Sequence, residues 1–476
     1  MSRTEAKQLS ETRQGQPYVG LLQMLRVLAL RSALRNRDKW TLEQLRRHQE
    51  EALKKLRAYA YANSPFYKKF HQGLYDVPLK DLPVLTKSEL MKHWDDVVTD
   101  RTVKLKDVEN FLDGWRGGRF RNRYYINITG GTTGQKGIFI YNSDEWRAVL
   151  GSYGRTLSFA NLSLGVIRPL KQAVVASTYP WHVTATVGST SRSRFILNLR
   201  LDTTEPLGNI VDKLNAFQPE VLSGYPSMVR LLAAEQIEGR LRISPRSVNT
   251  YSEAQTEDTR VAISKAWGVH AFNMYVATET GVVAFDCPEH RGLHIYEDLG
   301  IPEFVDGNNQ PVAPGQYSAK VLATVLFSRT LPLIRYQLED SICLTKETCP
   351  CGRPFSLIYD VQGRIQEVIH LEGKSGGDVL IQPLFWKGIL KDVSCDGWQI
   401  VQNGRSSLTV VILHPEVDFD EAHFKQRLVS ELVKQGSVEP SIDLEYPSSL
   451  QRTATGKVAL IKALTPTHYL NEVNAT

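Results

Sequence analysis

The 476-residue sequence lacks the features that mark fibrous, disordered or membrane-spanning chains. It has no internal repeat and no low-complexity tract, and 33 glycines with 9% aromatic residues are ordinary for a globular chain. No apolar run is long enough to cross a bilayer. The opening MSRTEAKQLSETRQ lacks the apolar core of a secretory signal, so we expect a cytoplasmic protein. A chain that is 42% hydrophobic at this length buries a large core, in about two to four domains.

The sequence also lacks a large net charge and has few cysteines. The formal net charge is only +6, and no Lys/Arg run or aromatic RNP box indicates a nucleic-acid partner. A slight basic excess suits nucleotides and other small anions equally well. The five cysteines are an odd number and form no disulfide-like ladder, which favours a reducing compartment and a metal site.

Residues 18–34, YVGLLQMLRVLALRSAL, are the most apolar segment. Arg26 and Arg31 interrupt it, and it is too short to span a membrane. We expect a helix whose leucines pack on the body of the protein; an anchor lying at a membrane surface is the alternative.

Apolar periodicity divides the rest into a long α/β region and a smaller α+β region. Residues 41–64 have leucines at helical spacing, and Thr86 is suited to cap the following helix. In the long region we expect strands at 124–128, 138–141, 172–176, 221–223 and 248–250, and helices at 226–236 and 257–267. Beyond a turn expected at 362–364, the smaller region has predicted strands at 398–401, 408–413 and 442–446 and a helix at 421–434.

The strongest local motif is TGGTTGQKG at residues 129–137. Its four glycines permit a tight loop whose N–H groups converge on phosphate oxygens, with Thr hydroxyls and Lys136 as further donors. It matches neither the spacing of a Walker loop nor the helix that should follow one. A plain hairpin turn is the alternative.

TGGTTGQKG resembles the phosphate loop of acyl-adenylate-forming enzymes, which include acyl- and aryl-CoA ligases, luciferases and peptide-synthetase adenylation domains. Four more motifs of that superfamily follow in order: YVATE at 275–279, IRYQLED at 334–340, Gly363-Arg364, and RTATGK at 452–457. YANSPFY at 61–67 and LTK at 85–87 narrow the resemblance to the branch of phenylacetate–CoA ligases and coenzyme F390 synthetases. The resemblance runs from about residue 40 to the end.

This resemblance implies a large multi-sheet N-terminal adenylating domain and a small mobile α+β C-terminal domain. The expected division is a 1–40 extension, a 41–363 adenylation domain and a 364–476 domain with the catalytic lysine. It also implies ATP, Mg²⁺ and CoA as ligands, a carboxylic acid as substrate, and an acyl-AMP intermediate. A homodimer is left open.

The resemblance also implies roles for individual residues. The phosphate loop would use Thr129, Gly130, Gly131, Thr132, Thr133, Gly134 and Lys136. The other nucleotide contacts implied are Tyr275 against the adenine, Ser252, Glu253 and Asn273 around it, Thr278 at the α-phosphate, and Asp340 on both ribose hydroxyls. Glu279 would bind Mg²⁺, Lys457 would stabilise charge between carboxylate and α-phosphate, and Arg364 would begin the hinge. Taken singly, Asp340, Glu279 and Lys457 have ordinary structural alternatives; the order of the motifs favours the functional roles.

Two positions depart from the superfamily pattern. Val276 stands where glycine usually follows the tyrosine, which puts a Cβ beside the nucleotide. Gln366, followed by Glu367, occupies the usual Asp or Lys of the hinge. The second half-reaction is therefore less firmly implied than adenylation, and an amine, a carrier protein or a non-carboxylate oxyanion stays open. A catalytically silent relative is a further alternative.

The cysteines form a second candidate site. Cys349-Pro350-Cys351-Gly352 is a tight turn with two thiolates, and Cys287 precedes it with His290 and His294 nearby. Three thiolates and one imidazole are a closed, structural zinc set. The resemblance favours His294 over His290, since some members of the branch carry such a site. Buried unpaired cysteines are the alternative, and a zinc-dependent hydrolase is disfavoured because no catalytic base is evident.

Candidates for binding the acid are Trp181, His182, Tyr225 and Pro226, in predicted loops after strands. Their rings would suit an aromatic acid. A core role for the same aromatic residues stays equally open.

Overall fold

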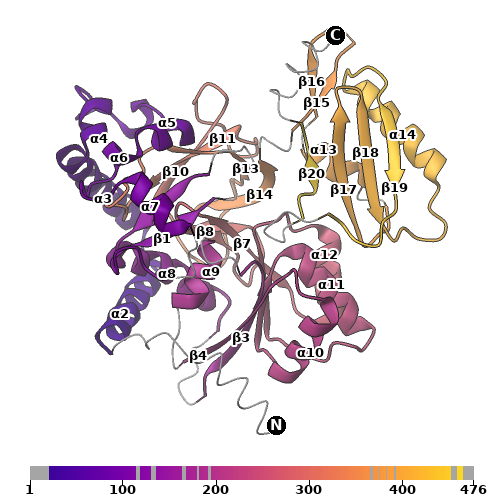
Figure 1. The fold of residues 1–476 in the computed structure, drawn as a ribbon, viewed down its shortest axis with the longest axis horizontal. Coiled ribbons are helices and arrows are strands. Elements are labelled where there is room, and N and C mark those ends of the chain that lie inside the picture. Colours follow the sequence, from indigo (N-terminus) through magenta and orange to yellow (C-terminus); the bar gives the residue numbers. More distant parts are fainter. Residues whose placement is uncertain are drawn as a thin grey trace.

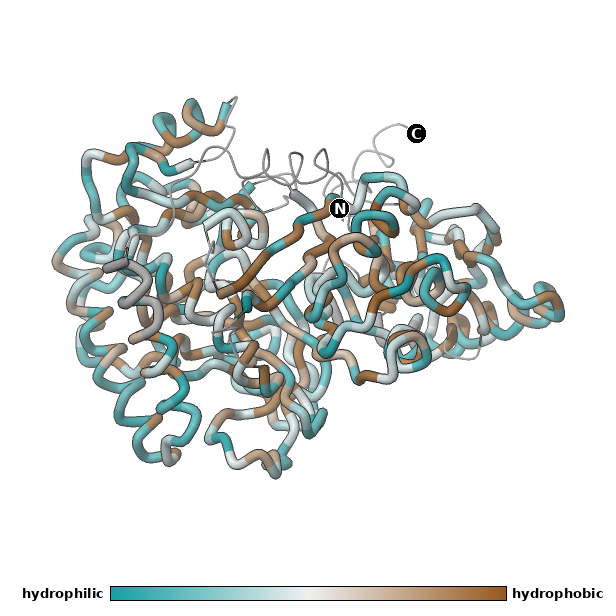
Figure 2. Tube along the Cα trace, turned by 90° about the horizontal axis from the view of Figure 1, so that it is seen from below, coloured by the Kyte–Doolittle hydropathy of each residue, from teal (hydrophilic) through white to brown (hydrophobic). Residues whose placement is uncertain are grey.

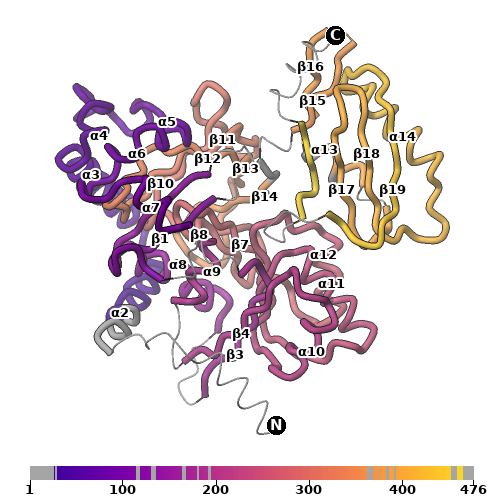
Figure 3. Tube along the Cα trace, in the orientation of Figure 1, coloured from indigo at the N-terminus to yellow at the C-terminus, as the bar shows by residue number. Residues whose placement is uncertain are grey.

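The computed structural model describes residues 21–113, 118–129, 136–162, 168–178, 182–190, 195–364, 368–374, 376–381, 383–390, 393–451 and 458–464. Figure 1 shows a large lobe that contains every element up to β14 and a smaller lobe that begins at β15. The tube in Figure 3 follows the chain from the indigo helices through the magenta sheet to the yellow C-terminal lobe.

Helices open the large lobe, and polar side chains cap several of them. They are α2 (Leu21–Arg37), α3 (Leu42–Asn63), α4 (Pro65–Phe70), the 3-10 turn η1 (Leu79–Asp81), α5 (Lys87–Lys92), α6 (Trp94–Val97) and α7 (Leu105–Leu112). Thr41 and Gln44 form a capping box at the start of α3. Ser64 ends α3 and caps α4, and the Thr86 hydroxyl accepts from the Glu89 N–H as predicted.

Helix α2 packs on α8 (Ser143–Phe159) through its leucines. Leu34 is 1% exposed, and a Cβ on Gly151 of α8 would lie 2.9 Å from Leu30. Just beyond α2, Asp38 pairs with the buried Arg155, whose Nη1 lies 2.7 Å from Oδ1 of Asp298. The packed helix predicted for this segment is thus confirmed for its described part. Within the described residues no helix is long and apolar enough to cross a membrane.

A nine-stranded sheet is the centre of the large lobe, with strand order β13-β14-β9-β8-β7-β6-β5-β3-β4. Its strands are β3 (Leu170–Val175), β4 (Ile196–Leu201), β5 (Val221–Gly224), β6 (Ser247–Tyr251), β7 (Ala271–Ala277), β8 (Gly281–Phe285), β9 (Leu293–Ile295), β13 (Asp340–Leu344) and β14 (Leu357–Arg364). Strands β3 to β7 pair in parallel, and the remaining pairs are antiparallel. The carboxyl ends of the parallel strands therefore meet at one edge, where α/β folds place ligands.

Helices cover both faces of the parallel strands. These are α8, α9 (Val183–Thr190), α10 (Leu207–Phe217), α11 (Pro226–Ile237) and α12 (Glu257–Trp267). In Figure 1, α10, α11 and α12 lie together on one side of the sheet and α8 and α9 on the other. In Figure 2 apolar segments run through the interior, while the helices at the periphery are largely hydrophilic.

Two smaller sheets complete the large lobe. The hairpin β1 (Tyr125–Ile128) and β2 (Ile138–Tyr141) is one, and β10 (Gly300–Val305), β11 (Lys320–Val325) and β12 (Tyr336–Leu338) form the other. Their inner faces and the first helices share one apolar core, which includes the fully buried Trp94 and Trp146.

The C-terminal lobe has its own apolar core around Trp386 and Ile400. Its elements are β15 (Ile369–Glu372), β16 (Asp378–Ile381), α13 (Pro383–Leu390), β17 (Gly397–Gly404), β18 (Ser407–Leu413), α14 (Glu421–Lys434), β19 (Ser441–Glu445) and β20 (Ile461–Lys462). The four-stranded order is β19-β18-β17-β20, with β20 parallel to β17.

The elements predicted from the sequence are present, with ends within two or three residues. One local prediction is wrong. Residues 362–364 do not turn, because they continue β14, and Arg364 pairs with Asp340 at the end of the ladder. The division of the chain at residue 363 stays a prediction.

Candidate functional site

The glycine-rich segment joins two antiparallel strands, which explains why no helix follows it. Thr129 directly follows β1: its N–H donates to the carbonyl of Gly137 at 3.0 Å, and its hydroxyl accepts from the Gly137 N–H at 2.8 Å. A Cβ at Gly137 would lie 2.9 Å from the Phe139 ring, so glycine is required there. Lys136 lies in the same stem, and Gly130, Gly131, Thr132, Thr133 and Gly134 lie outside the described residues.

The structure brings together two residues expected at the nucleoside. Tyr275 is on β7 and Asp340 begins β13, and the Tyr275 hydroxyl donates to Oδ2 of Asp340 at 2.6 Å. Arg364 pairs with Asp340 across β13 and β14, so the two backbones lie side by side; the Arg364 side chain is outside the described part. A phenol and a carboxylate side by side offer an apolar face for a base and acceptors for hydroxyl groups.

The turn between β7 and β8 carries Thr278 and Glu279. The Tyr141 hydroxyl, at the end of β2, donates to the Thr278 carbonyl at 2.6 Å. Glu279 is 6% exposed. Burial of Tyr141, and then the charge of Glu279, raise the pKa of the Tyr141 phenol well above its usual value. Gly281 closes the turn with φ +81°, and a Cβ there would lie 3.1 Å from Ser152 and Val149. The phosphate-loop hairpin and the Thr278–Glu279 turn therefore touch directly.

Ser252 and Glu253 follow β6 at the same edge of the sheet. Ser252 has φ +67°, a left-handed conformation that is rare for a serine and is often found at functional sites. One Glu253 oxygen accepts from the N–H of Ser227 at 3.1 Å and the other from the N–H of Val458 at 2.7 Å. Asn273 lies on the neighbouring β7, where its carbonyl accepts from the Asp286 N–H at 3.1 Å.

The candidates for the acid site separate in the structure. Tyr225 is 1% exposed, its hydroxyl accepts from the Ser177 N–H, and its ring lies 5.9 Å from that of Tyr251. Pro226 is the first residue of α11. Both belong to the core of the sheet edge, which favours the structural alternative for them. His182 directly precedes α9, and Trp181 lies outside the described residues.

Arg200, which sequence reasoning missed, lies beside these aromatic residues. Its guanidinium donates to the carbonyls of Thr184 at 2.9 Å and Ser177 at 3.3 Å, and burial lowers its pKa. The charge of the nearby Asp202 acts on the guanidinium in the opposite direction. The signal in the sequence was a charged residue in a mainly apolar strand.

Lys457 also lies outside the described residues, but both flanks of its loop are described. Gln399 on β17 is fully buried, and its amide donates to the carbonyls of Gln451 at 3.2 Å and Ala459 at 2.6 Å. One side chain thus holds both stems of the 452–457 segment. Nothing local in the sequence indicated this role, which depends on the pairing of β17 with β20.

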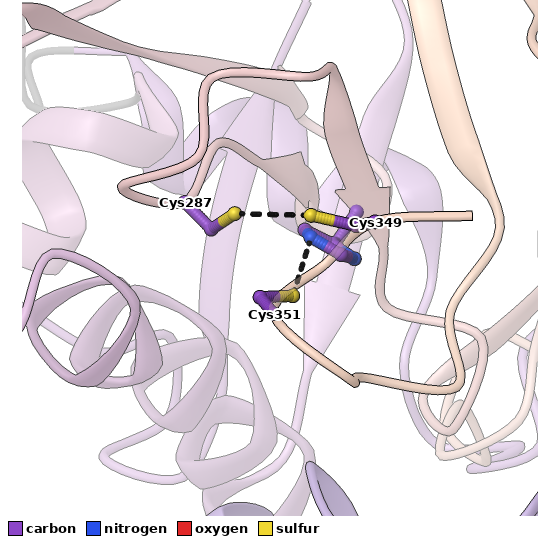
Figure 4. Close-up of side chains that lie close together, drawn as sticks. Cys287, Cys349 and Cys351 are labelled. Atoms are coloured by element: carbon purple, nitrogen blue, oxygen red, sulfur yellow. Dashed lines mark hydrogen bonds between the residues drawn. The ribbon is translucent and has the colours of Figure 1, made fainter. Parts of the chain in front are cut away.

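The four proposed zinc ligands converge away from the nucleotide residues. The ligand atoms of Cys287, His294, Cys349 and Cys351 all lie within 4.8 Å of one another, and the labelled cysteines point toward a common centre in Figure 4. The sulfurs of Cys287 and Cys349 are 3.6 Å apart, and Cys351 Sγ is 3.3 Å from His294 Nε2. A tetrahedral site with Zn–S bonds of about 2.3 Å has edges of about 3.8 Å, so this donor set fits zinc and not a disulfide.

The alternative ligand His290 is not part of this group. Its Nδ1 lies 2.6 Å from Asp286, and its ring packs on Phe272. Burial, then the charges of Arg353 and Arg155, lower the pKa of His294 to about 4, which keeps that imidazole in the neutral, metal-binding form.

The pKa values of the three cysteine thiols are shifted in different directions. Burial raises the pKa of Cys287 and of Cys349. At Cys351 burial is outweighed by hydrogen bonds from the backbone and side chain of Arg353, and the pKa is lowered. Cys287 and Glu279 lie beyond opposite ends of β8, whose five residues span about 16 Å. A metal here would brace the β8–β9 hairpin against the 349–352 turn and would not touch the nucleotide.

The fold was compared with those of solved structures. It matches the crystal structure of 2-hydroxyisobutyryl-CoA ligase in the postadenylation state with a TM-score of 0.68, at 18% identity, over 92% of this chain and 93% of that one. The chain therefore has the fold of acyl-adenylate-forming CoA ligases, and the predicted fold class is confirmed.

Comparison with known sequences indicates which acyl-adenylate-forming enzymes the chain resembles. No protein-family model matches the chain. It is 27% identical over 350 residues to the phenylacetate–coenzyme A ligase of Thermus thermophilus, which covers 70% of this chain and 73% of that protein. It is 23% identical over 450 residues to the phenylacetate–coenzyme A ligase of Aromatoleum evansii, which covers 88% and 94%. The predicted resemblance to the phenylacetate–CoA ligase branch is confirmed.

Proposed function

We propose that this protein activates a carboxylic acid with ATP and transfers the acyl group to CoA. In the first step the carboxylate oxygen attacks the α-phosphorus, the acyl-AMP forms and pyrophosphate leaves. In the second step the CoA sulfur attacks the acyl carbonyl and AMP leaves. The observation that carries the proposal is the convergence of Tyr275 with Asp340, and of Tyr141 with the Thr278–Glu279 turn, in a chain similar to phenylacetate–CoA ligases.

The residue roles follow the chemistry. Two anions must approach each other, so their charge has to be neutralised. Lys457 and the phosphate loop would supply positive charge and N–H donors, and Asp340 would accept from the ribose hydroxyls. Glu279 would hold Mg²⁺, which neutralises phosphate charge when bound. The same proposal includes a structural zinc site, a cytoplasmic location and a homodimer.

An aromatic or short branched acid is the substrate class we propose. The two curated relatives are named for phenylacetate, whereas the solved neighbour is named for 2-hydroxyisobutyrate.

The test is acid-dependent exchange of pyrophosphate into ATP without CoA, over phenylacetate, benzoate, their hydroxy and amino derivatives, and 2-hydroxyisobutyrate. Exchange with one group of acids would support adenylation and identify the substrate class. The Lys457→Ala variant should lose exchange by more than about 100-fold while it still binds ATP. No exchange with any acid, despite ATP binding, would overturn the proposal in favour of a silent relative.

The acceptor is tested separately. CoA should convert the bound acyl-AMP into a thioester, detected by mass spectrometry. If an amine or a carrier protein accepts the acyl group and CoA does not, the CoA-transfer half of the proposal would be wrong. The different acceptor would then explain why Gln366 departs from the usual hinge residue.

A further inference from the structure

A single carboxylate joins the two lobes at the nucleotide site. Glu253 follows β6, and its Oε2 accepts from the N–H of Ser227, in the first turn of α11, at 3.1 Å. Its Oε1 accepts from the N–H of Val458 in the C-terminal lobe at 2.7 Å. One oxygen is therefore fixed to the large lobe while the other holds the small one, and Figure 1 shows α11 and α12 directly beside that lobe.

The atom that Glu253 binds in the C-terminal lobe is the backbone nitrogen of Val458. The nitrogen of Val458 belongs to the peptide unit that begins at the carbonyl of Lys457. Glu253 thus holds the residue that directly follows the proposed catalytic lysine in sequence.

Hydrogen bonds within the C-terminal lobe hold the two segments that flank residues 452–457. Gln399 donates to Gln451 and Ala459, on either side of the 452–457 segment. Lys462 Nζ also donates to Oε1 of Gln451 at 2.6 Å. The stems are therefore held together by their own lobe, and the Glu253 contact is what registers them against the large lobe.

One other described contact crosses the same interface. Arg230 on α11 donates to the carbonyl of Cys395 and lies 3.7 Å from Asp258 of α12. This contact docks the lobe as a whole but lies on a different segment from Val458. The two contacts can accordingly be removed one at a time.

We propose that Glu253 is a positioning residue for adenylation: its hydrogen bond to the Val458 N–H registers the C-terminal lobe, at the residue that follows Lys457 in sequence, against the large lobe. The proposal rests on the function proposed above and gives Glu253 a role other than lining the adenine. A hydrogen bond to an ionised acceptor is strong enough that its loss should slow the adenylation step about 10- to 100-fold. The thioester step does not need Lys457 at the α-phosphate, so it should change little.

The test measures the two half-reactions separately in the full-length protein. Glu253→Ala should lower kcat for acid-dependent pyrophosphate release about 10- to 100-fold with less than about a threefold change in KM for ATP. With synthetic acyl-AMP and CoA, the same variant should form thioester at nearly the wild-type rate. Glu253→Gln keeps one acceptor oxygen, so its kcat for pyrophosphate release should lie between those of wild type and Glu253→Ala. Glu257→Ala, which removes a carboxylate from the exposed first turn of α12, is the matched control.

Several outcomes would overturn the inference. Equal losses in both half-reactions would indicate a general structural role, and a raised KM for ATP with unchanged kcat would indicate a direct nucleotide contact. Hydrogen–deuterium exchange provides a readout independent of activity: the Val458 amide should exchange faster in Glu253→Ala than in wild type or Glu257→Ala, and unchanged exchange would contradict the contact. If wild type adenylates no acid, the proposed function fails, while the exchange measurement still decides whether Glu253 holds the loop.

Discussion

The Tyr275 hydroxyl donates a 2.6 Å hydrogen bond to Asp340, a residue 65 positions away in sequence. This pairing aligns the phenol and the carboxylate at one edge of the large sheet. The two residues would contribute differently to nucleotide binding, because Asp340 supplies the negative charge and Tyr275 orients the Asp340 carboxylate. The two side chains should therefore respond differently to substitution.

We predict that Asp340→Asn weakens ATP binding about 10- to 100-fold, because an amide oxygen accepts less strongly and the amide nitrogen faces ribose donors. Tyr275→Phe keeps the ring and removes only the hydroxyl, so ATP binding should fall less than about fivefold. Isothermal titration with a non-hydrolysable ATP analogue measures both. A larger loss for Tyr275→Phe than for Asp340→Asn would contradict the proposed division of roles.

Local patterns predicted the fold well where chain chemistry sets an element's ends. Helix α12 has its predicted bounds because Thr256 caps its start and Gly268, at φ +68°, ends it. The prediction of a turn at 362–364 was wrong because a Gly-Arg pair can also continue a strand, and here the pairing of β14 with β13 extends the strand through Arg364.

The site was less accessible to sequence reasoning. The motifs for Tyr275 and Asp340 pointed to a nucleotide, but only the folded structure shows that they touch, since three strands separate β7 from β13 in the sheet order. His290 and His294 have equally suitable spacing, and His294 is the one on β9, where strand pairing turns it toward the thiols. Gln399 gave no signal at all, since its two acceptors lie more than fifty residues away along the chain.

Gln399 leads to a second prediction. Gln399→Leu removes both donors to the stems of the Lys457 loop and leaves two carbonyls without them. We expect a stability loss of about 1–3 kcal/mol and a larger fractional loss of adenylation than of the thioester step.

Gln402 is a matched control on the same strand. It is 2% exposed, and its side chain bonds to His370, Gly404 and Leu464, not to the stems at Gln451 and Ala459. Gln402→Leu should cost similar stability in urea unfolding but affect both half-reactions equally. The role assigned to Gln399 would be wrong if the two variants had the same kinetic profile.

Metal content gives a third prediction. Purified protein should contain one zinc per chain by mass spectrometry, and Cys349→Ser should lose it. We expect the melting temperature to fall by roughly 5–10 °C, because a Cys₃His site contributes directly to folding. Adenylation at 25 °C should persist, since the cluster lies at the far end of β8 from Glu279.

Cys343→Ser is the control, because Cys343 is 4% exposed and lies outside the cluster. It should retain zinc. Loss of turnover as soon as a chelator removes zinc, before any unfolding, would instead assign the metal a catalytic role.

The fourth prediction concerns acid stability. His71 ends α4, is 6% exposed, and packs 5.0 Å from the Tyr67 ring, with Nε2 buried and unpaired. Burial, and then the nearby Arg57 guanidinium, lower the pKa of His71 to about 4. Above pH 6.5 the ring is neutral in folded and unfolded chains alike, so it contributes no pH dependence. Between pH 6.5 and 4 the unfolded chain takes up a proton that the folded chain refuses, so stability falls as the pH falls.

The size of this effect follows from the shift. At pH 4.5 the loss attributable to His71 should be about 2–3 kcal/mol relative to pH 7. His71→Phe keeps an aromatic ring against Tyr67 and cannot be protonated, so its free energy of unfolding should drop less between those pH values than that of wild type. Urea unfolding at both pH values measures the difference, with His423→Phe, on the surface of α14, as the control for losing a histidine. Equal drops for wild type and His71→Phe would show that His71 takes up its proton without unfolding the core around α4.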